Sequence, residues 1–356
     1  MRIAVDAMGG DQAPAAVVEG AYRAATEDGT PVLLVGRSEA IEGELARLGP
    51  AAADGRLEVV HADEVVGMDE PAVTPLRRKP HASIRVCVEL VQSGRAQALV
   101  TAGNTGAAMI AAKVILGTVP GVDRPALAAV LPNATGRTML LDVGANVDTR
   151  AAHLREFAVM GHSYAREVLG TLHPRVGLLS IGEEEGKGSD LTREVFRALQ
   201  TTGLEFVGNV EGGDIFSGRA DVVVCDGFVG NVVLKSAEAL VDQAARMLRQ
   251  EVVAASWRTR LGYALARPAV ERLRARTDYA EYGAAPLLGL TAGCFIAHGR
   301  SSPRAIRSAV RRASEFAEGR VHEKIRDRMA ELHSQEELLA GRPAPVAAPT
   351  GVPDHL

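Results

Sequence analysis

The chain has 356 residues, of which 47% are hydrophobic, and a formal net charge of -4. This length can form one large α/β unit or two lobes whose core needs neither disulfides nor metals. Because a general nucleic-acid-binding protein usually carries a basic excess, we expect no nucleic-acid partner. No apolar run reaches the roughly 18 residues of a membrane span, and the N-terminus lacks the basic flank and apolar stretch of a signal peptide.

Three cysteines, Cys87, Cys225 and Cys294, lie far apart and form no CxxC pair. Free cysteines are usually buried, and cytosolic proteins rarely use disulfides. We therefore expect all three in the core of a cytoplasmic protein.

Short apolar runs alternate with segments of helical periodicity along the chain. The runs that predict strands are residues 3–5, 32–35, 57–60, 98–101, 126–131, 138–143, 176–181, 205–207, 222–225 and 294–297. Most are continuously apolar, which is typical of strands covered on both faces. The pattern predicts an α/β fold, with a mostly parallel sheet between two layers of helices, as one unit over residues 1–340. The Pro- and Ala-rich residues 341–356 are expected to form a disordered tail.

Six predicted strands lead directly into segments that mix glycine with acidic, amide or basic residues. These segments are DAMGGD, TAGNTG, DVGANVD, GEEEGKG, CDGFVGN and AHGRSS. One glycine-rich turn is more often geometry than function, but ligands of such folds bind beyond the carboxyl ends of the strands. Six polar exits on one edge therefore predict a single polar cleft. The residues predicted to line it are Asp6, Gly9, Gly10, Asp11, Asp142, Asn146, Glu183 and Asp226.

The segment TAGNTG precedes a predicted helix that runs to about residue 116. Backbone N–H groups at a helix start, with the helix dipole behind them, form an anion site, and small residues let a phosphate come close. We predict phosphate contact at Gly103, Asn104, Thr105 and Gly106. Asn104 or Thr105 can also serve as an N-cap, and the two roles are compatible.

Two further exits carry residues suited to charge stabilisation. Lys187, one of five lysines, stands between glycines in the acidic loop GEEEGKG. Its ammonium group is expected to pair either with a substrate oxyanion or with the neighbouring glutamates. The alternative without a function is a charged loop that is simply solvated. CDGFVGN places Asn231 at a strand-to-helix junction. Because GxSxG, HExxH and Walker lysine motifs are missing, the sequence favours positioning of an anion over attack by a side chain, with no metal and no cofactor.

Together and in order, these segments resemble the bacterial phosphate acyltransferase family, PlsX. The resemblance spans residues 1–336 and also rests on GNVEGGDI and EYGAAPLLGL. It implies a three-layer α/β/α homodimer similar to phosphotransacetylases and to the isocitrate and isopropylmalate dehydrogenases. It further implies transfer of a fatty acyl group from acyl carrier protein to inorganic phosphate. The acyl phosphate then serves a membrane glycerol-3-phosphate acyltransferase in phospholipid synthesis.

The resemblance also suggests roles for individual residues. Ionised phosphate can attack a thioester directly, so the protein must orient two anionic partners and donate hydrogen bonds to the developing oxyanion. Lys187, with the TAGNTG segment, is expected to hold phosphate, and Asn231 or His298 to stabilise the oxyanion or leaving thiolate, without a covalent intermediate. Lys187, Asn231 and His298 are thus the predicted catalytic residues. Asp6, Asp11 and Asp142 are expected to order donors. Many family members have histidine where this chain has Gln12, so a base at that position does not carry over. Residues 80–82 also depart from the family pattern.

Two basic clusters are candidates for docking the acidic carrier protein. They are Arg77, Arg78 and Lys79, and Arg272, Arg274 and Arg276. A solvated face is the alternative for each.

The segment SWRTRLGYALARPAVERLRAR predicts a helical hairpin over about residues 231–277, bent near Pro268. Trp257, Leu261 and Leu265 recur every four residues beside Tyr263 and several arginines. This pattern predicts a peripheral membrane anchor, while a dimer contact is the other interpretation, and one hairpin can serve both.

Three other activities stay open on the sequence. The first is a short-chain phosphotransacetylase acting on acyl-coenzyme A, and the second is a non-catalytic membrane scaffold. A dehydrogenase has support from the expected fold alone, and a fold does not choose among activities.

Overall fold

The computed structural model describes residues 1–49, 55–277 and 284–340, with side chains for all but 273–277 and 335–340. Within this part of the chain, eleven strands form one sheet in the order β3-β2-β1-β4-β11-β10-β5-β6-β9-β7-β8. The strands are β1 (Ile3–Asp6), β2 (Val32–Gly36), β3 (Leu57–His61), β4 (Ala98–Thr101), β5 (Ala126–Pro132), β6 (Arg137–Leu141), β7 (Arg175–Leu179), β8 (Glu205–Val210), β9 (Val222–Val224), β10 (Ala285–Leu288) and β11 (Gly293–Ile296).

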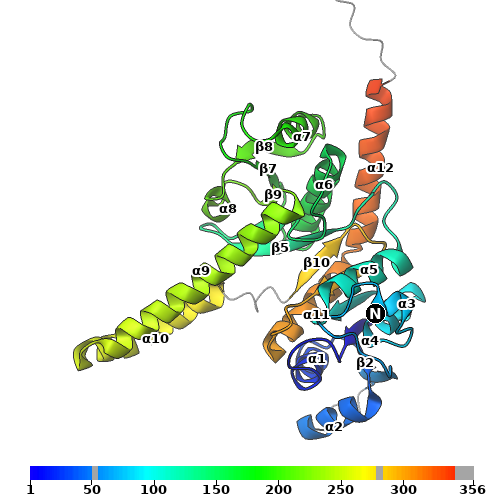
Figure 1. The fold of residues 1–356 in the computed structure, drawn as a ribbon, viewed down its shortest axis with the longest axis vertical. Coiled ribbons are helices and arrows are strands. Elements are labelled where there is room, and N and C mark those ends of the chain that lie inside the picture. Colours follow the sequence, from blue (N-terminus) through cyan, green and yellow to red (C-terminus); the bar gives the residue numbers. More distant parts are fainter. Residues whose placement is uncertain (50–54, 278–283, 341–356) are drawn as a thin grey trace, which may run out of the picture.

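Helices cover both faces of this sheet (Figure 1). They are α1 (Ala15–Glu27), α2 (Ser38–Leu48), α3 (Thr74–Arg77), α4 (Ser83–Gln92), α5 (Thr105–Leu116), α6 (Ala151–Glu167), α7 (Asp190–Gln200), α8 (Asp214–Ser217), α9 (Gly227–Ala254), α10 (Trp257–Thr277), α11 (Pro303–Glu318) and α12 (Val321–Ala340).

Successive strand residues enter two separate cores. In β1, Ile3 and Val5 pack into the core beneath α1, α6 and α11, whereas Ala4 packs into the core beneath α4 and α5. Side chains of a strand alternate between the two faces of a sheet, so continuously apolar strands require a helical layer on each face. The predicted α/β class with a mostly parallel sheet is confirmed, and all three cysteines are buried, as expected.

The sheet consists of two parallel sets of strands that run in opposite directions. We call β3-β2-β1-β4-β11 the first half-sheet and β6-β9-β7-β8 the second half-sheet. Between them, β10 is antiparallel to β11, β5 to β10, and β6 to β5, so the direction reverses three times. The prediction that all six polar exits share one edge is therefore wrong. The exits of β1, β4 and β11 lie at one edge, and those of β6, β7 and β9 belong to the oppositely directed set.

Strand β10 was not predicted. Its sequence, APLL, is short and contains Pro286, and proline argues against an interior strand because it removes a ladder hydrogen bond. In the fold, the strand bridges the two half-sheets, a role set by tertiary pairing.

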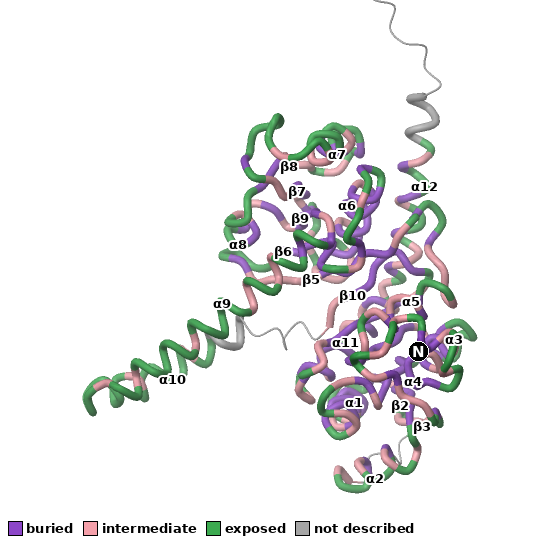
Figure 2. Tube along the Cα trace, viewed as in Figure 1, coloured by how far each residue is buried: buried purple, intermediate pink, exposed green. Residues whose placement is uncertain are grey.

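The predicted hairpin is present, although its turn lies elsewhere. Helices α9 and α10 project from the body side by side (Figure 1), and they meet at residues 255–256, not at Pro268, which lies inside α10. In α9, the buried residues are Gly227 and Gly230, so most of its length lacks a covering layer (Figure 2). Among the described residues, no helix combines the length and apolar character needed to cross a bilayer. The predicted tail at 341–356 lies outside the described residues.

Candidate functional site

The exits of β1 and β4 are joined by the buried carboxylate of Asp6. Its Oδ2 accepts from Thr101 Oγ1 at 2.7 Å, and its Oδ1 accepts from the Met8 N–H at 3.2 Å. Thr101 Oγ1 in turn accepts from the Gly103 N–H at 3.0 Å. Burial raises the pKa of Asp6, and these hydrogen bonds oppose the rise. Asp6 is therefore a buried residue that holds the loops after β1 and β4 together through its hydrogen bonds.

Gly9 and Gly103 touch through their backbones. A Cβ on Gly9 would lie 2.7 Å from the Gly103 nitrogen, closer than real Cβ atoms approach. The same loop meets the exit of β11, because the Asp11 N–H donates to the Gly299 carbonyl at 2.8 Å. Thus the predicted residues Gly9, Gly10 and Asp11 join the exits of β1, β4 and β11 in one cluster.

The side chain of Asn104 is fully engaged in structural contacts. Its Oδ1 accepts from the Ala107 N–H at 2.9 Å, which makes it the N-cap of α5. Its Nδ2 donates to the carbonyls of Gly67, Met68 and Glu70 at 3.1, 2.9 and 2.9 Å. Asn104 therefore holds the segment 67–70 against the start of α5, and its side chain has no donor left for phosphate.

The backbone at the start of α5 is available. No hydrogen bond of the described residues uses the N–H of Asn104, Thr105 or Gly106. Thr105 is exposed, and the next N–H, of Ala107, is satisfied by the cap. Three donors with the positive end of the helix dipole can bind an oxyanion group.

In the second half-sheet, Asp142 organises the loop after β6. Its Oδ1 accepts from the N–H groups of Leu127, Gly144 and Ala145 at 3.0, 3.1 and 3.0 Å. Its Oδ2 accepts from N and Nδ2 of Asn146 at 2.7 and 2.8 Å. Burial raises the pKa of Asp142, against the effect of these donors. Both Asp142 and Asn146 are buried, so they build the wall of the site and do not line a cleft.

The first turn of α9 packs backbone to backbone on this loop. Asp226 caps the helix by accepting from the Val229 N–H at 2.8 Å. The Gly227 N–H donates to the Asn146 carbonyl at 2.8 Å. A Cβ on Gly230 would lie 1.8 Å from the Asp142 carbonyl oxygen. Glycine is required here because the helix approaches the loop too closely for any side chain.

Charged residues of helix α9 lie near His298, which follows β11. Burial lowers the pKa of His298, Lys235 of α9 lowers it further, and Glu238 opposes this shift. Lys235 and Glu238 are themselves paired at 2.8 Å. The predicted residue Asn231 lies one turn before Lys235, beside Gly144. His298 and Asn231 thus belong to the region where the half-sheets meet.

The exit of β7 is separate from this region. Glu183 is paired at 2.6 Å with Arg219, which follows α8, so its carboxylate is not free in a cleft. Lys187 is exposed and lies over Gly182 in the same loop. No contact given by the described residues brings its ammonium group to the start of α5.

The predicted docking clusters differ in availability. Arg77, Arg78 and Arg272 are exposed. Lys79 is partly buried, and its Nζ donates to the Val65 carbonyl at 2.7 Å and to Glu70, so it fastens the segment 65–79. The side chains of Arg274 and Arg276 lie outside the described residues.

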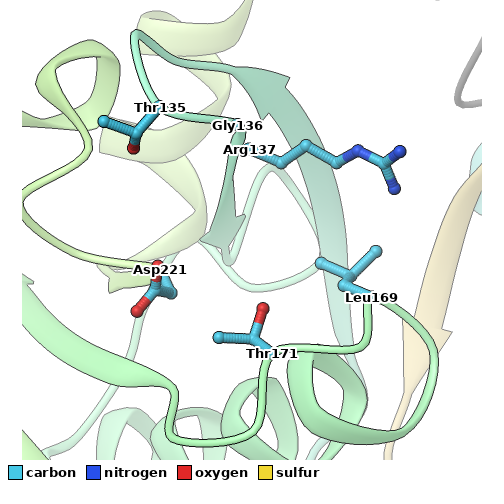
Figure 3. Close-up of a pocket in the computed structure, with 6 residues that line it drawn as sticks. All are labelled: Thr135, Gly136, Arg137, Leu169, Thr171 and Asp221. Carbon is cyan, nitrogen blue, oxygen red and sulfur yellow. The ribbon is translucent and has the colours of Figure 1, made fainter.

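Two hollows accompany the second half-sheet. One, of about 260 Å³, opens at the carboxyl ends of β7 and β9. The other, of about 220 Å³, is lined by Thr135, Arg137, Leu169 and Asp221 at the amino ends of β6 and β9 (Figure 3). Asp221 is paired there with Arg175 at 3.0 Å. This hollow is not part of the candidate site, which lies beyond the carboxyl ends of the strands. The described residues hold no cluster of metal-ligating side chains.

Two residues that matter for the geometry were not among the predicted site residues. The Thr101 hydroxyl donates to Asp6 and accepts from the Gly103 N–H. Lys235 lies near His298. Thr101 is the last residue of a strand, directly before a glycine-rich exit, and that position is a usable signal. The proximity of Lys235 to a residue 63 positions later has no local signal in the sequence.

Named relatives match this chain over nearly its whole length. Residues 1–324 fit the family described as fatty acid synthesis protein. The phosphate acyltransferase of Pelobacter propionicus is 50% identical over 333 residues, which cover 94% of this chain and 95% of that protein. The chain belongs to the phosphate acyltransferase family. A second member, from Geobacter sulfurreducens, is 49% identical over 329 residues, which cover 92% of this chain and 94% of that protein.

Family membership makes the chain an acyltransferase. A phosphotransacetylase from Streptococcus pyogenes has a similar structure, with a TM-score of 0.60 and 18% identity over 89% of this chain and 94% of that one. At this identity the likeness concerns the fold alone. The predicted family and fold are confirmed, and the finer assignments of donor, partner and residue roles follow as proposals.

Proposed function

We propose that this phosphate acyltransferase transfers a fatty acyl group from acyl carrier protein to inorganic phosphate. The acyl phosphate then serves a membrane glycerol-3-phosphate acyltransferase in phospholipid synthesis. Within the family, the observation that carries the proposal is the set of unused N–H groups at residues 104–106, at the start of α5. These donors suit the oxygens of a phosphate group.

In the proposed reaction, a phosphate oxygen attacks the carbonyl carbon of the thioester. The C–O bond forms, the carbonyl becomes a tetrahedral oxyanion, and the C–S bond then breaks to release the carrier thiolate, which takes a proton from solvent. Phosphate is already an anion at neutral pH, so the site mainly supplies orientation and electrostatic stabilisation.

The geometry supports dividing these tasks between the half-sheets. The first half-sheet supplies phosphate donors, with Lys187 as an added cation from the second. Asn231 and His298 are proposed to donate to the oxyanion or the leaving thiolate, near Lys235. A lowered pKa keeps His298 neutral at pH 7, so that it acts as a hydrogen-bond donor and not as a fixed cation.

Docking of the acidic carrier is assigned to the exposed arginines Arg77, Arg78 and Arg272, with Arg274 and Arg276 completing the second cluster. The projecting hairpin is proposed to serve both a homodimer contact and peripheral membrane binding in the cytoplasm. Trp257 and Leu265 are 70% and 77% exposed, Leu261 is exposed, and Tyr263 is half-buried. Exposed Trp and Leu beside arginines suit a membrane interface.

The proposal is tested by trapping acyl phosphate with hydroxylamine. Purified protein is mixed with palmitoyl-carrier protein, with and without phosphate, and the expected product is hydroxamate that depends on phosphate. If acetyl-coenzyme A with phosphate reacts and the carrier substrate does not, the short-chain phosphotransacetylase replaces this proposal. If neither reacts, the non-catalytic membrane scaffold becomes the better account.

A further inference from the structure

Met68 is an exposed apolar side chain at the point where three strand exits meet. It is 49% exposed and lies in the segment 67–70. Its backbone carbonyl accepts from Asn104 Nδ2 at 2.9 Å, at the exit of β4. Its side chain lies at the exit of β11, because Met68 Cε is 3.3 Å from the place that a Cβ on Gly299 would take. Asp11, from the exit of β1, contacts the same glycine, so Met68 belongs to the cluster of these exits.

The chain on both sides of Met68 is fixed in place. Asn104 Nδ2 also donates to the carbonyls of Gly67 and Glu70, and the Gly67 N–H donates to Glu70 Oε1 at 2.9 Å. Lys79 Nζ donates to Glu70 as well. These bonds set where the Met68 side chain begins. Its flexible, unbranched thioether can then adapt to the shape of a ligand.

Met68 lies between the groups assigned to the two reactants. Asn104 is the first of the three residues whose N–H groups are proposed to hold phosphate. Gly299 directly follows His298, which is proposed to donate to the oxyanion or the thiolate. The carbon that phosphate attacks is therefore expected near Met68. Asp11, Asn104 and Gly299 are polar or lack a side chain, so Met68 supplies the apolar surface for carbons of the acyl group.

An apolar cover at this point has a chemical purpose in the proposed reaction. Water can attack the same thioester carbon in competition with phosphate. Its oxygen would form the C–O bond, the C–S bond would break, and a proton of the water would pass to the leaving thiolate. The products would be a free fatty acid and the carrier thiol. A site that transfers the acyl group to phosphate must therefore keep water from that carbon.

We propose that Met68 covers the acyl carbons next to the thioester carbonyl and excludes water from the carbon that phosphate attacks. The inference rests on the proposed function, because it assigns a contact to the acyl donor of that reaction. Met68 is then a specificity-determining residue for the choice between phosphate and water as the acceptor.

The test measures how much thioester is lost to water. Release of the carrier thiol from palmitoyl-carrier protein is followed with a thiol reagent, and incorporation of radiolabelled phosphate into acyl phosphate is followed in parallel. All three cysteines of the chain are buried, so the reagent reports the carrier thiol. For the unchanged protein, the initial rates of thiol release and acyl phosphate formation are expected to be equal.

Met68→Ser is expected to release thiol without phosphate roughly tenfold faster than the unchanged protein, because water reaches the uncovered carbon. With phosphate present, its thiol release should exceed its acyl phosphate formation. Met68→Leu keeps an apolar cover and should keep the two rates equal. Val114→Ser is the control, because Val114 of α5 is 64% exposed and lies about 14 Å along the helix axis from Thr105. It should behave as the unchanged protein does.

Two results would overturn the inference. One is a Met68→Ser variant with equal rates and no gain in phosphate-free thiol release. The other is a Met68→Ser variant that slows both reactions in proportion, as a purely structural defect would.

A binding measurement separates this inference from the proposed function. Carrier protein whose thiol bears a hexadecyl thioether cannot react, and calorimetric titration gives its affinity. Met68→Ser should weaken this binding about fivefold, because part of the apolar contact is lost, and Met68→Leu should preserve it. If this difference is present but no acyl phosphate forms from palmitoyl-carrier protein, the proposed function fails and the contact stands. If acyl phosphate forms but Met68→Ser changes neither the affinity nor the loss to water, the contact fails alone.

Discussion

At the scale of single residues, Asn104 shows how a motif can be located correctly and its role assigned only in part. The sequence marked it as a phosphate ligand or an N-cap. The structure makes it the cap and adds the bonds to the segment 67–70. A cap can be predicted from the residue type and the following helix. The partners 34 to 37 residues earlier cannot, because they depend on how two loops pack.

Replacing Asn104 by Ala should lower the free energy of unfolding by about 2 to 3 kcal/mol, from the lost cap and the lost loop bonds. Denaturant unfolding measures this value, and hydrogen exchange should quicken at residues 67–70. Thr105→Ala is the control, since its side chain has no hydrogen bond among the described residues, and should change stability by less than about 0.5 kcal/mol. Equal effects of both variants would contradict the structural role of Asn104.

His298 offers a test of how the half-sheets meet. Lys235 lowers its pKa, and Glu238 raises it. Lys235→Gln should therefore raise the pKa of His298, and Glu238→Gln should lower it, in an imidazole titration followed by NMR. Shifts of the same sign, or no shift in either variant, would mean that α9 does not lie beside the exit of β11.

The lowered pKa of His298 also makes the stability of the fold depend on pH. Because the folded state holds the pKa of His298 below that of the unfolded chain, the unfolded chain binds the proton more readily. The contribution of neutral His298 to stability is present above the unfolded pKa and is lost as pH falls through the folded value.

At the scale of elements, most strands and helices follow from apolar runs and periodicity, including the helix that ends at Leu116. Three features do not. The strand at Ala285–Leu288, the reversal of the second half-sheet and the hairpin turn at residues 255–256 all depend on which elements pair in space. Proline at position 268 suggested the turn, but it lies inside α10 and the helix continues through it.

The close approach of α9 to the loop after β6 gives the sharpest prediction for an element. Gly230→Ala should cost about 3 kcal/mol or more, since the added Cβ meets the Asp142 carbonyl and α9 must shift. Activity should fall with it, because Asn231 moves with the helix. Gly262→Ala in α10 meets no neighbouring atom and should instead stabilise the protein by about 0.5 to 1 kcal/mol. Thermal and denaturant unfolding distinguish the pair, and destabilisation by both changes would contradict the packing described.

At the scale of the whole molecule, the hairpin of α9 and α10 projects from the body and is largely exposed (Figure 2). A variant with Trp257→Glu and Leu261→Glu should lose flotation with anionic liposomes, because two charges enter the apolar surface at the hairpin. Unchanged flotation would exclude these residues as the membrane contact. Light scattering on the unchanged protein and on this variant tests whether the proposed dimer forms and whether it depends on this surface.

The central claim is that the site orients phosphate and the thioester for direct reaction, with no acylated enzyme between them. The most direct measurement is carrier exchange without phosphate: the protein is incubated with palmitoyl-carrier protein and isotope-labelled free carrier. We predict no transfer of palmitate to the labelled carrier, because nothing on the enzyme accepts the acyl group until phosphate is present. Transfer of palmitate to the labelled carrier at a rate near turnover would reveal an acyl-enzyme and contradict the account.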